Sequence, residues 1–243
     1  MLDVETLRRS VSEWNEVRHI DPTLTADLSG ANLSNTNLSH ANLSGIDFSD
    51  VKITGANLTG ANLSEANLIL TDLSGVDLRE ANLSGVDLRG KDFCGKNLSK
   101  TNFTGADLYK VSLRGANLTG SNLSGARLEE AKLSNANLAA ADLSDANLNG
   151  AILFEADLTG AKLNNAEVIN ANICMAKLNG ADFTGANLKF SYLVDTDFTN
   201  VTTYEGANLS KVCFTRAEFF DQISRGVDMD HLELINPEMR PLR

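Results

Sequence analysis

The sequence is poor in the residues that stabilise small secreted domains. Its 243 residues include three cysteines, three prolines and one tryptophan. Three cysteines do not form a disulfide framework. Cys94 and Cys174 are expected to face outward on the same side of the fold, too far apart for a disulfide bond. A reduced, cytoplasmic protein is the simplest interpretation.

Catalytic and metal-binding patterns are also missing. The three histidines, His19, His40 and His231, lie far apart in the sequence. None is placed beside a serine or cysteine as in a catalytic triad, and none has the spacing of metal ligands. The carboxylates lack the sheltered setting that tunes a general acid. The sequence therefore predicts no enzyme, no catalytic residue, no metal and no cofactor.

Membrane and nucleic-acid signals are absent too. No apolar run approaches the ~18 residues of a membrane-spanning helix. The N-terminus lacks the apolar core of a signal peptide. The net charge of −11 argues against direct nucleic-acid binding, which needs a basic surface. The partner expected from composition is a protein.

What the sequence does contain is a period of five. From Leu28 to Phe198 an apolar residue stands at every fifth position, usually with a small residue two places earlier. Asn or Asp lies between the two, and Ser or Thr and often Gly follow. A helix would place apolar residues every 3.6 positions and a strand every second position, so the period fits neither.

A chain that turns a corner every five residues explains the pattern. Asn, Asp, Ser and Gly favour turns, because their side chains bond the local backbone or tolerate unusual φ. Four sides of five residues close one coil. Stacked coils would pair at about 4.8 Å, giving a rod about 43 Å long, with Leu and Phe filling its axis.

The five-residue unit resembles the pentapeptide-repeat family. Clean copies are Ala56-Asn57-Leu58-Thr59-Gly60 and Ala181-Asp182-Phe183-Thr184-Gly185, and the run covers about four fifths of the chain. The resemblance implies an all-β solenoid, a right-handed quadrilateral β-helix. The segment from Trp14 to Arg18, followed by Asp27 to Ala31, resembles the cap of bacterial, often cyanobacterial, members. Membership in the family does not imply a function.

The expected organisation has three parts. Residues 1–22 form an N-terminal cap, because residues 3–19 have the spacing of an amphipathic helix that Pro22 would end. Trp14 is expected to seal the open end of the core, with a docking role as the alternative. Residues 23–220 form the β-helix. Residues 221–243 form a C-terminal cap or an irregular tail.

Lys91 and Lys96 break the pattern, since both occupy small-residue positions. A buried ammonium without a partner is costly, so either the wall bulges there or the amines reach out to solvent. The stretch from Gly90 to Asn97 nearly matches a phosphate-binding loop. It lacks the Ser or Thr after the lysine and the strand-to-helix context, so nucleotide binding is rejected. A packing defect or a feature that faces a partner remains.

One column of residues 20 apart is acidic. Asp27, Asp47, Asn67, Asp87 and Asp107 would stack along one edge. A solvated face, or carboxylates that accept turn N–H groups, is one interpretation. An acidic strip that imitates DNA phosphates is another. A Ca²⁺ site is weaker, because it needs 6–8 converging oxygens.

A second column changes from polar to apolar. The outward positions Ser34, Thr54, Ser74, Arg114 and Ser134 are polar. A candidate protein interface follows on the same wall, and it consists of Ile152, Phe154, Cys174, Met175, Tyr192 and Val194. An exposed apolar patch usually marks an interface. The C-terminal tail, a second copy or another protein could cover it.

At the C-terminal end the register shifts by one residue near Thr203 and Tyr204. Two or three further repeats follow, up to Phe219. Residues 227–234 form either a degenerate coil or a helical cap, and Pro237 and Pro241 mark an irregular end.

Two functions are compatible with this sequence. The first is a structural, protein-interaction module whose flat walls bind a protein partner or a second copy. The second comes from the resemblance: some family members protect DNA gyrase or topoisomerase from quinolones by imitating DNA, and dimerise through their C-terminal ends. Basic residues such as Arg79, Arg89 and Arg127 dilute the negative field here, and no inserted loop interrupts the rod.

Overall fold

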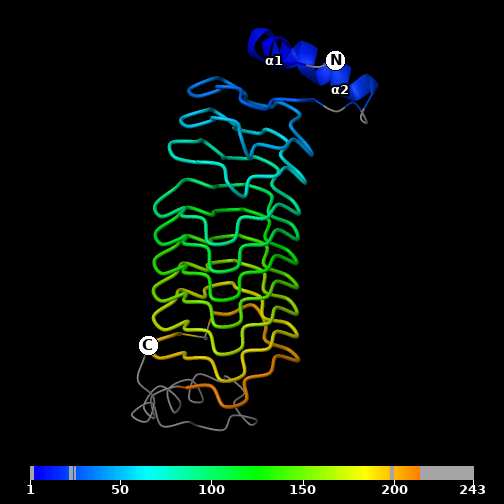
Figure 1. The fold of residues 1–243 in the computed structure, drawn as a ribbon. Helices are drawn as coiled ribbons and strands as arrows, with labels where there is room; N and C mark the ends of the chain where they lie inside the picture. The colour runs from blue at the N-terminus through cyan, green and yellow to red at the C-terminus, as the bar shows by residue number, and fades with distance from the viewer. Residues whose placement is uncertain (1–2, 22–23, 25, 198–199, 214–243) are drawn as a thin grey trace.

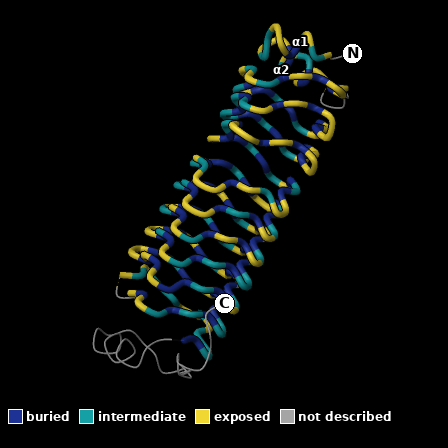
Figure 2. Tube along the Cα trace, turned by 60° about the vertical axis from the view of Figure 1, so that its left-hand side comes forward, coloured by how far each residue is buried: buried dark blue, intermediate teal, exposed yellow. Residues whose placement is uncertain are grey.

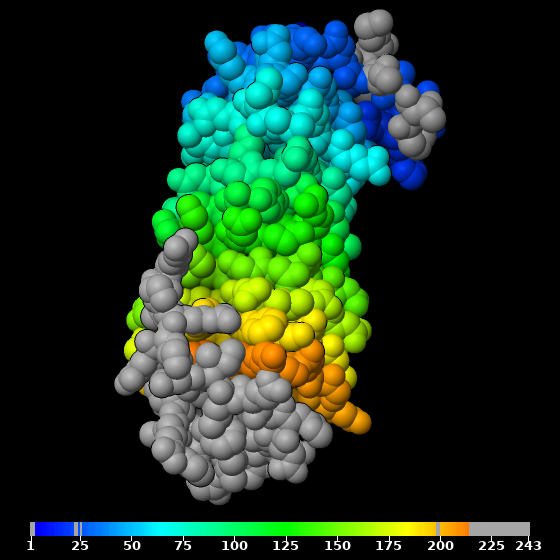
Figure 3. Space-filling model, turned by 60° about the horizontal axis from the view of Figure 1, so that its bottom comes forward, coloured from blue at the N-terminus to red at the C-terminus, as the bar shows by residue number. Residues whose placement is uncertain are grey.

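The chain forms a long four-sided solenoid with two short helices at one end. The structure is a computed structural model that describes residues 3–21, 24, 26–197 and 200–213. Helices α1 (Val4–Arg9) and α2 (Val11–Ile20) lie above the first coils (Figure 1). In Figure 3 the colours follow one another along the rod, so position in the sequence sets height along the axis.

The length of each coil follows from the pairing of its neighbours. Parallel bridges join residues that are 20 apart, such as Asn37 to Asn57 and Asn117 to Asn137. A corner with positive φ recurs at nearly every fifth residue, which gives four sides per coil. The expected four-sided coil is therefore confirmed. Within the described ranges the walls are made of isolated bridges instead of named strands, because each side has only one paired residue between two turns.

The core is the axis of the rod. The central Leu and Phe residues are almost wholly buried, and the small residue two places earlier is buried as well, as the dark inner face in Figure 2 shows. Phe48, Phe93, Phe103 and Phe183 are the bulkiest residues inside the solenoid. A small side chain next to each large one lets successive walls approach while the large one fills the centre.

The Asn or Asp of each repeat is the paired residue of its side and supports the corner that follows it. Its side-chain oxygen accepts a hydrogen bond from the backbone N–H two residues on, as Asn32 does from Ser34 at 3.1 Å. The amides also bond from coil to coil, as Asn82 Nδ2 does to Asn62 Oδ1 at 3.0 Å. Glycine serves where space is short: a Cβ on Gly60, whose φ is +66°, would lie 2.5 Å from Nδ1 of His40. Local bonding and left-handed φ thus explain the composition of the repeat.

The N-terminal cap consists of two helices, not the single helix expected over residues 3–19. Ser10 interrupts it, because its extended backbone places its hydroxyl to accept from Glu13 N–H and begin α2. Trp14 is fully buried, and its Nε1 donates to Asn42 O at 2.7 Å. Asn15 adds bonds to His40 O and from Asn42 N–H. Trp14 therefore seals the core, as the first interpretation held.

The stack of coils opens at one level. Elsewhere backbone bonds join each coil to the next, as from Leu63 N–H to Asn82 O and from Leu83 N–H to Asn102 O. Among the described residues no such bond joins residues 66–78 to residues 87–97, and the bridges of this level are missing as well. We call this level the ladder break. Figure 1 shows the wider spacing between the cyan and green coils.

Lys91 and Lys96 lie in the ladder break. Lys91 Nζ donates to Ile69 O at 2.9 Å and to Thr71 O at 2.8 Å, and Lys96 Nζ donates to Leu73 O at 3.1 Å. Burial lowers the pKa of Lys91, and nearby carboxylate charges partly oppose this. The wall opens, as one alternative held. The other alternative was wrong, because the amines bond to backbone carbonyls of the preceding coil and do not turn out to solvent.

The corner beside the break has an unusual shape. Of the described corners between residues 30 and 195, Asp50 and Leu70 lack positive φ, whereas Gly90 below them has a φ of 65°. A large side chain such as Leu is disfavoured in the left-handed region. Met175 and Phe190 nevertheless adopt positive φ at their corners, so the size of Leu70 alone does not explain the difference between its corner and that of Gly90 across the ladder break.

The expected shift of register is confirmed. Asp182 pairs with Thr203 and Asn187 with Asn208, so the pairing moves by one residue relative to the earlier coils. Thr202 N–H donates to Ala181 O while Thr203 O accepts from Phe183 N–H, so two residues oppose one, as in a β-bulge. The predictions for residues 214–243 lie outside the described residues.

Candidate protein-binding wall

The candidate interface occupies one wall of the solenoid, which we call the Phe154 wall. Its outward residues form two columns. One runs through Ser112, Lys132, Ile152, Asn172 and Tyr192, joined by parallel bridges. The other runs through Arg114, Ser134, Phe154, Cys174 and Val194, at positions 20 apart. The backbone register fixes this arrangement, so residues 40 or 80 apart in sequence share one surface.

The apolar part of this wall lies over three successive coils. Ile152, Phe154, Tyr192 and Val194 are half-buried, and Met175 is 46% exposed at the next corner. Cys174 stands in an outward column as expected, but it is only 5% exposed, so it adds little to the exposed patch. It lies between Phe154 and Val194 in its column, and these larger side chains flank the small thiol.

The carboxylates of the candidate acidic edge do not form a uniform negative strip. Asp27 and Asp47 are exposed and accept the N–H groups of Ser29 and Ser49, each at 2.9 Å. Hydrogen bonds from these serines lower the pKa of both carboxyls. These two carboxylates thus serve as turn acceptors, in line with the structural interpretation.

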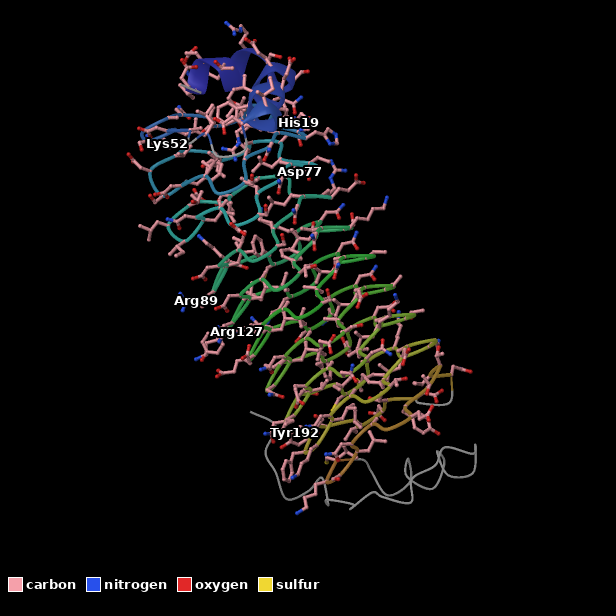
Figure 4. The ribbon with its side chains drawn as sticks, turned by 90° about the vertical axis from the view of Figure 1, so that its right-hand side faces the viewer. His19, Lys52, Asp77, Arg89, Arg127 and Tyr192 are labelled. Atoms are coloured by element: carbon pink, nitrogen blue, oxygen red, sulfur yellow. The ribbon has the colours of Figure 1, made fainter. Side chains whose placement is uncertain are left out.

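Farther along the edge the carboxylates are paired with arginines. Arg89 Nη2 lies 2.6 Å from Asp87 Oδ2, and these hydrogen bonds hold the pKa of Asp87 below its usual value. Arg127 Nη1 lies 2.7 Å from Asp107 Oδ2. Figure 4 shows Arg89 and Arg127 near each other along one side of the rod. The ladder break also separates Asn67 from Asp87, so the column is neither continuous nor uniformly negative.

A cleft of about 350 Å³ opens beside the ladder break. Two of its cations are neutralised, since Arg89 pairs with Asp87 and Lys110 lies 3.3 Å from Glu130. Next to it, Ile69 is 53% and Leu70 is 78% exposed, which the sequence reading did not single out. Their position at a corner where Ser and Gly usually stand was the available signal. The residues lining the cleft are Ile69, Asp87, Arg89, Gly90, Lys91, Tyr109 and Lys110.

The described residues contain no group of three His, Cys, Asp or Glu side chains arranged to hold a metal ion. Cys94, Cys174 and Cys213 form no disulfide bond. Within the described ranges neither helix has the length and apolar character needed to span a bilayer.

The architecture defines a repeat protein of the solenoid class, built from stacked four-sided coils. The sequence matches the profile of pentapeptide repeats in segments 26–64, 56–94, 81–120, 97–135, 131–167 and 169–202. The chain therefore belongs to the pentapeptide repeat family, whose members are generally non-enzymatic structural repeat proteins. No curated protein matches the sequence.

Solved structures share the fold. A trypsin-treated variant of QnrB1, a plasmid-mediated fluoroquinolone resistance protein, superposes with a TM-score of 0.59 at 19% identity, over 83% of this chain and 96% of that chain. HetL, a pentapeptide repeat protein involved in heterocyst differentiation regulation in the cyanobacterium Nostoc sp. strain PCC 7120, is 29% identical over 83% of this chain and 96% of its own, with a TM-score of 0.40. At its level of identity the QnrB1 likeness establishes the solenoid fold.

Proposed function

We propose that this chain is a non-enzymatic protein-interaction module whose Phe154 wall binds a protein partner. The solenoid supplies a rigid surface, because every side chain on a wall is fixed by the backbone register of its coil. Binding would bury the patch formed by Ile152, Phe154, Met175, Tyr192 and Val194.

The observation that supports this proposal is that the core does not need these residues. Leu153, Ile173 and Leu193 fill the axis of the same coils and are at most 1% exposed. The outward apolar residues therefore add surface that remains in contact with water, at positions that hold Ser or Arg in earlier coils. A contiguous patch of this kind is typical of an interface.

The test is a pull-down from host lysate with the double variant Phe154→Glu/Val194→Glu. Its matched control is Thr159→Glu/Asn179→Glu, which adds the same charge to exposed positions of an adjoining wall on neighbouring coils. The proposal expects a protein that the wild type and the control capture and the Phe154 variant loses. Circular dichroism checks that all three fold. Equal capture by all three proteins would contradict the proposal.

A second candidate function is DNA mimicry directed at gyrase or topoisomerase. The net charge of −11 and the fold shared with QnrB1, a fluoroquinolone resistance protein, favour it. The arginines paired with Asp87 and Asp107 weigh against it, because they neutralise the middle of the acidic edge. Inhibition of gyrase supercoiling by the purified protein would support this candidate, and no inhibition at high protein concentration would reject it.

Other predictions complete the proposal. The coil is inferred to be right-handed, as the family resemblance implies, with a cap over residues 1–22, a β-helix over residues 23–220 and a cap or tail over residues 221–243. A cytoplasmic location fits three cysteines that form no disulfide bond. A dimer formed through the C-terminal end is the alternative to a different protein partner, and sedimentation analysis of the purified chain tests it.

A further inference from the structure

Half of the lysine and arginine side chains in the described part of the solenoid, seven of fourteen, have an acidic partner. Each lies within 4 Å of a carboxylate, and several bond to the residue at the equivalent position of the adjacent coil. Such neutralisation is expected in a chain with a net charge of −11. The paired residues are Arg79, Arg89, Lys100, Lys110, Arg127, Lys162 and Lys177.

Three of the other seven lie on the Phe154 wall. Lys52, Arg114 and Lys132 are exposed and form no ion pair or side-chain hydrogen bond with any described residue. Lys52 and Lys132 occupy the same column of the wall, and Arg114 lies in the adjacent column. Other cations without an ion pair have different contacts: Lys189 lies over the ring of Phe190, 5.0 Å from its centroid.

Two carboxylates, Asp72 and Asp92, stand between Lys52 and Lys132 at positions 20 apart, and neither forms an ion pair with them. Asp92 precedes Arg114 by one coil, and its pKa is lowered first by hydrogen bonds from Cys94 and then by the charges of Arg114 and Lys96. Glu155 is exposed at the far corner of the wall. None of these carboxylates lies within 4 Å of Arg114 or Lys132. Both cations are therefore available to bind a carboxylate of a partner.

The unpaired cations adjoin the apolar patch. Lys132 is bridged directly to Ile152, and Arg114 stands two coils from Phe154 in the same column. Two coils correspond to about 10 Å, which an extended peptide covers in about three residues. A segment lying along the rod could therefore place one carboxylate at Arg114 and an apolar side chain against Phe154.

We propose that the occupant of the Phe154 wall is an acidic segment of a partner protein, with Asp or Glu about three residues from a large apolar anchor. The inference rests on the proposed function and deepens it. The anchor covers the patch around Phe154, and its acidic residues lie over Arg114 and Lys132. In a protein of net negative charge this local field attracts only the matching segment and orients it along the wall.

The test starts from a random peptide library displayed on phage, selected on the wild-type protein and counter-selected on Phe154→Glu/Val194→Glu. The proposal expects enriched peptides to carry Asp or Glu about three residues from a large apolar residue. Enrichment of basic or uncharged peptides, or no enrichment, overturns it.

Binding of the best peptide to purified variants supplies the second readout. The double variant Arg114→Glu/Lys132→Glu should weaken binding at least tenfold, with a steep loss of wild-type affinity as salt increases. The matched control Lys162→Glu/Lys177→Glu makes the same charge change on other walls and should bind like the wild type.

The failures of the two proposals differ. If Phe154→Glu/Val194→Glu abolishes binding but Arg114→Glu/Lys132→Glu does not, the wall still binds a partner and the acidic segment is wrong. If the selected peptides bind the Phe154 variant as well as the wild type, the wall itself is not the site. Self-association of the pure protein that is lost in the Phe154 variant would make a second copy the occupant and would overturn the acidic segment.

Discussion

Replacing Lys91 and Lys96 with alanine should close the ladder break. Alanine fills the equivalent positions in later coils, where Ala131 and Ala136 are at most 1% exposed. Without the two long side chains that bridge the separated coils, we expect the backbones to approach toward the spacing seen elsewhere in the rod.

The magnitudes decide which assay can detect closure. Each regained backbone bond contributes about 0.5–1.5 kcal/mol, whereas each lost bond from a lysine ammonium is worth about 1.5–3 kcal/mol. More bonds are regained than lost, but each is weaker. The two sets therefore largely cancel, and we expect the free energy of unfolding to change by less than about 3 kcal/mol. A global unfolding curve is a poor readout, and a local measurement is needed.

Amide hydrogen exchange provides that measurement. The N–H groups of Leu68, Leu73 and Leu78 face the break and have no acceptor among the described residues, whereas the corresponding N–H of Phe93 donates to Ser112 O at 2.7 Å. If a bonded amide must open at a cost of about 3 kcal/mol, its exchange is slower by roughly 100-fold.

In the wild type, the three amides at the break should therefore exchange on the order of 100-fold faster than that of Phe93, and in the double alanine variant the difference should shrink. Equal protection of all four amides in the wild type would refute the reasoning, because the ladder would then be closed in solution.

Three further predictions concern stability. Phe103→Ala should lower the free energy of unfolding by about 3–5 kcal/mol because Phe103 is 1% exposed in the core, whereas Phe103→Leu should cost less than about 2 kcal/mol in denaturant titrations. Trp14→Ala should fray the cap and first coils before the rest of the rod, seen as a separate early transition in calorimetry. Hydrogen bonds from Arg89 depress the pKa of Asp87 in the folded state, so its contribution is present above about pH 4 and is lost as the pH falls through the folded pKa. Asp87→Asn should therefore show a smaller loss of melting temperature on acidification than the wild type.

The five-residue pattern predicted the fold because each position has one role. Leu58 had to lie on the axis, Ala56 beside it, and Asn57 on the outer face before the corner at Gly60, since only this arrangement buries the apolar residues of a chain that turns every five residues. The family match and the shared fold with QnrB1 agree with that reading. The change of register near Thr203 was also visible, because one extra residue displaces every later apolar position.

The ladder break was only half visible from the sequence. Two lysines at small-residue positions signalled a defect, but whether a lysine turns outward or bonds to backbone carbonyls depends on how far the neighbouring coil moves. The contribution of Leu70 depends on a backbone angle, which the sequence does not reveal. The low exposure of Cys174 was not predictable from its outward position in the repeat.

Ion pairing on the walls was harder still to predict. Arg89 and Arg127 both reach Asp107, a contact set by side-chain conformation as well as by the register of the coils. The exposed positions of Arg114 and Lys132 follow from the repeat. Their lack of carboxylate partners does not, because it depends on which cations the neighbouring carboxylates bind.

The four-sided coil also determines how this protein can change in length. An insertion or deletion of one whole coil leaves every side chain on its wall and alters only the height at which it stands. A change of a single five-residue side turns everything that follows by one wall, so an insertion between Lys132 and Ile152 would carry the apolar patch away from the basic residues. The single extra residue near Thr203 is an exception among the described residues, because the bulge absorbs it and the later side chains stay on their walls. Whole coils are therefore the steps in which such a rod can grow or shorten during evolution and still present the same surfaces.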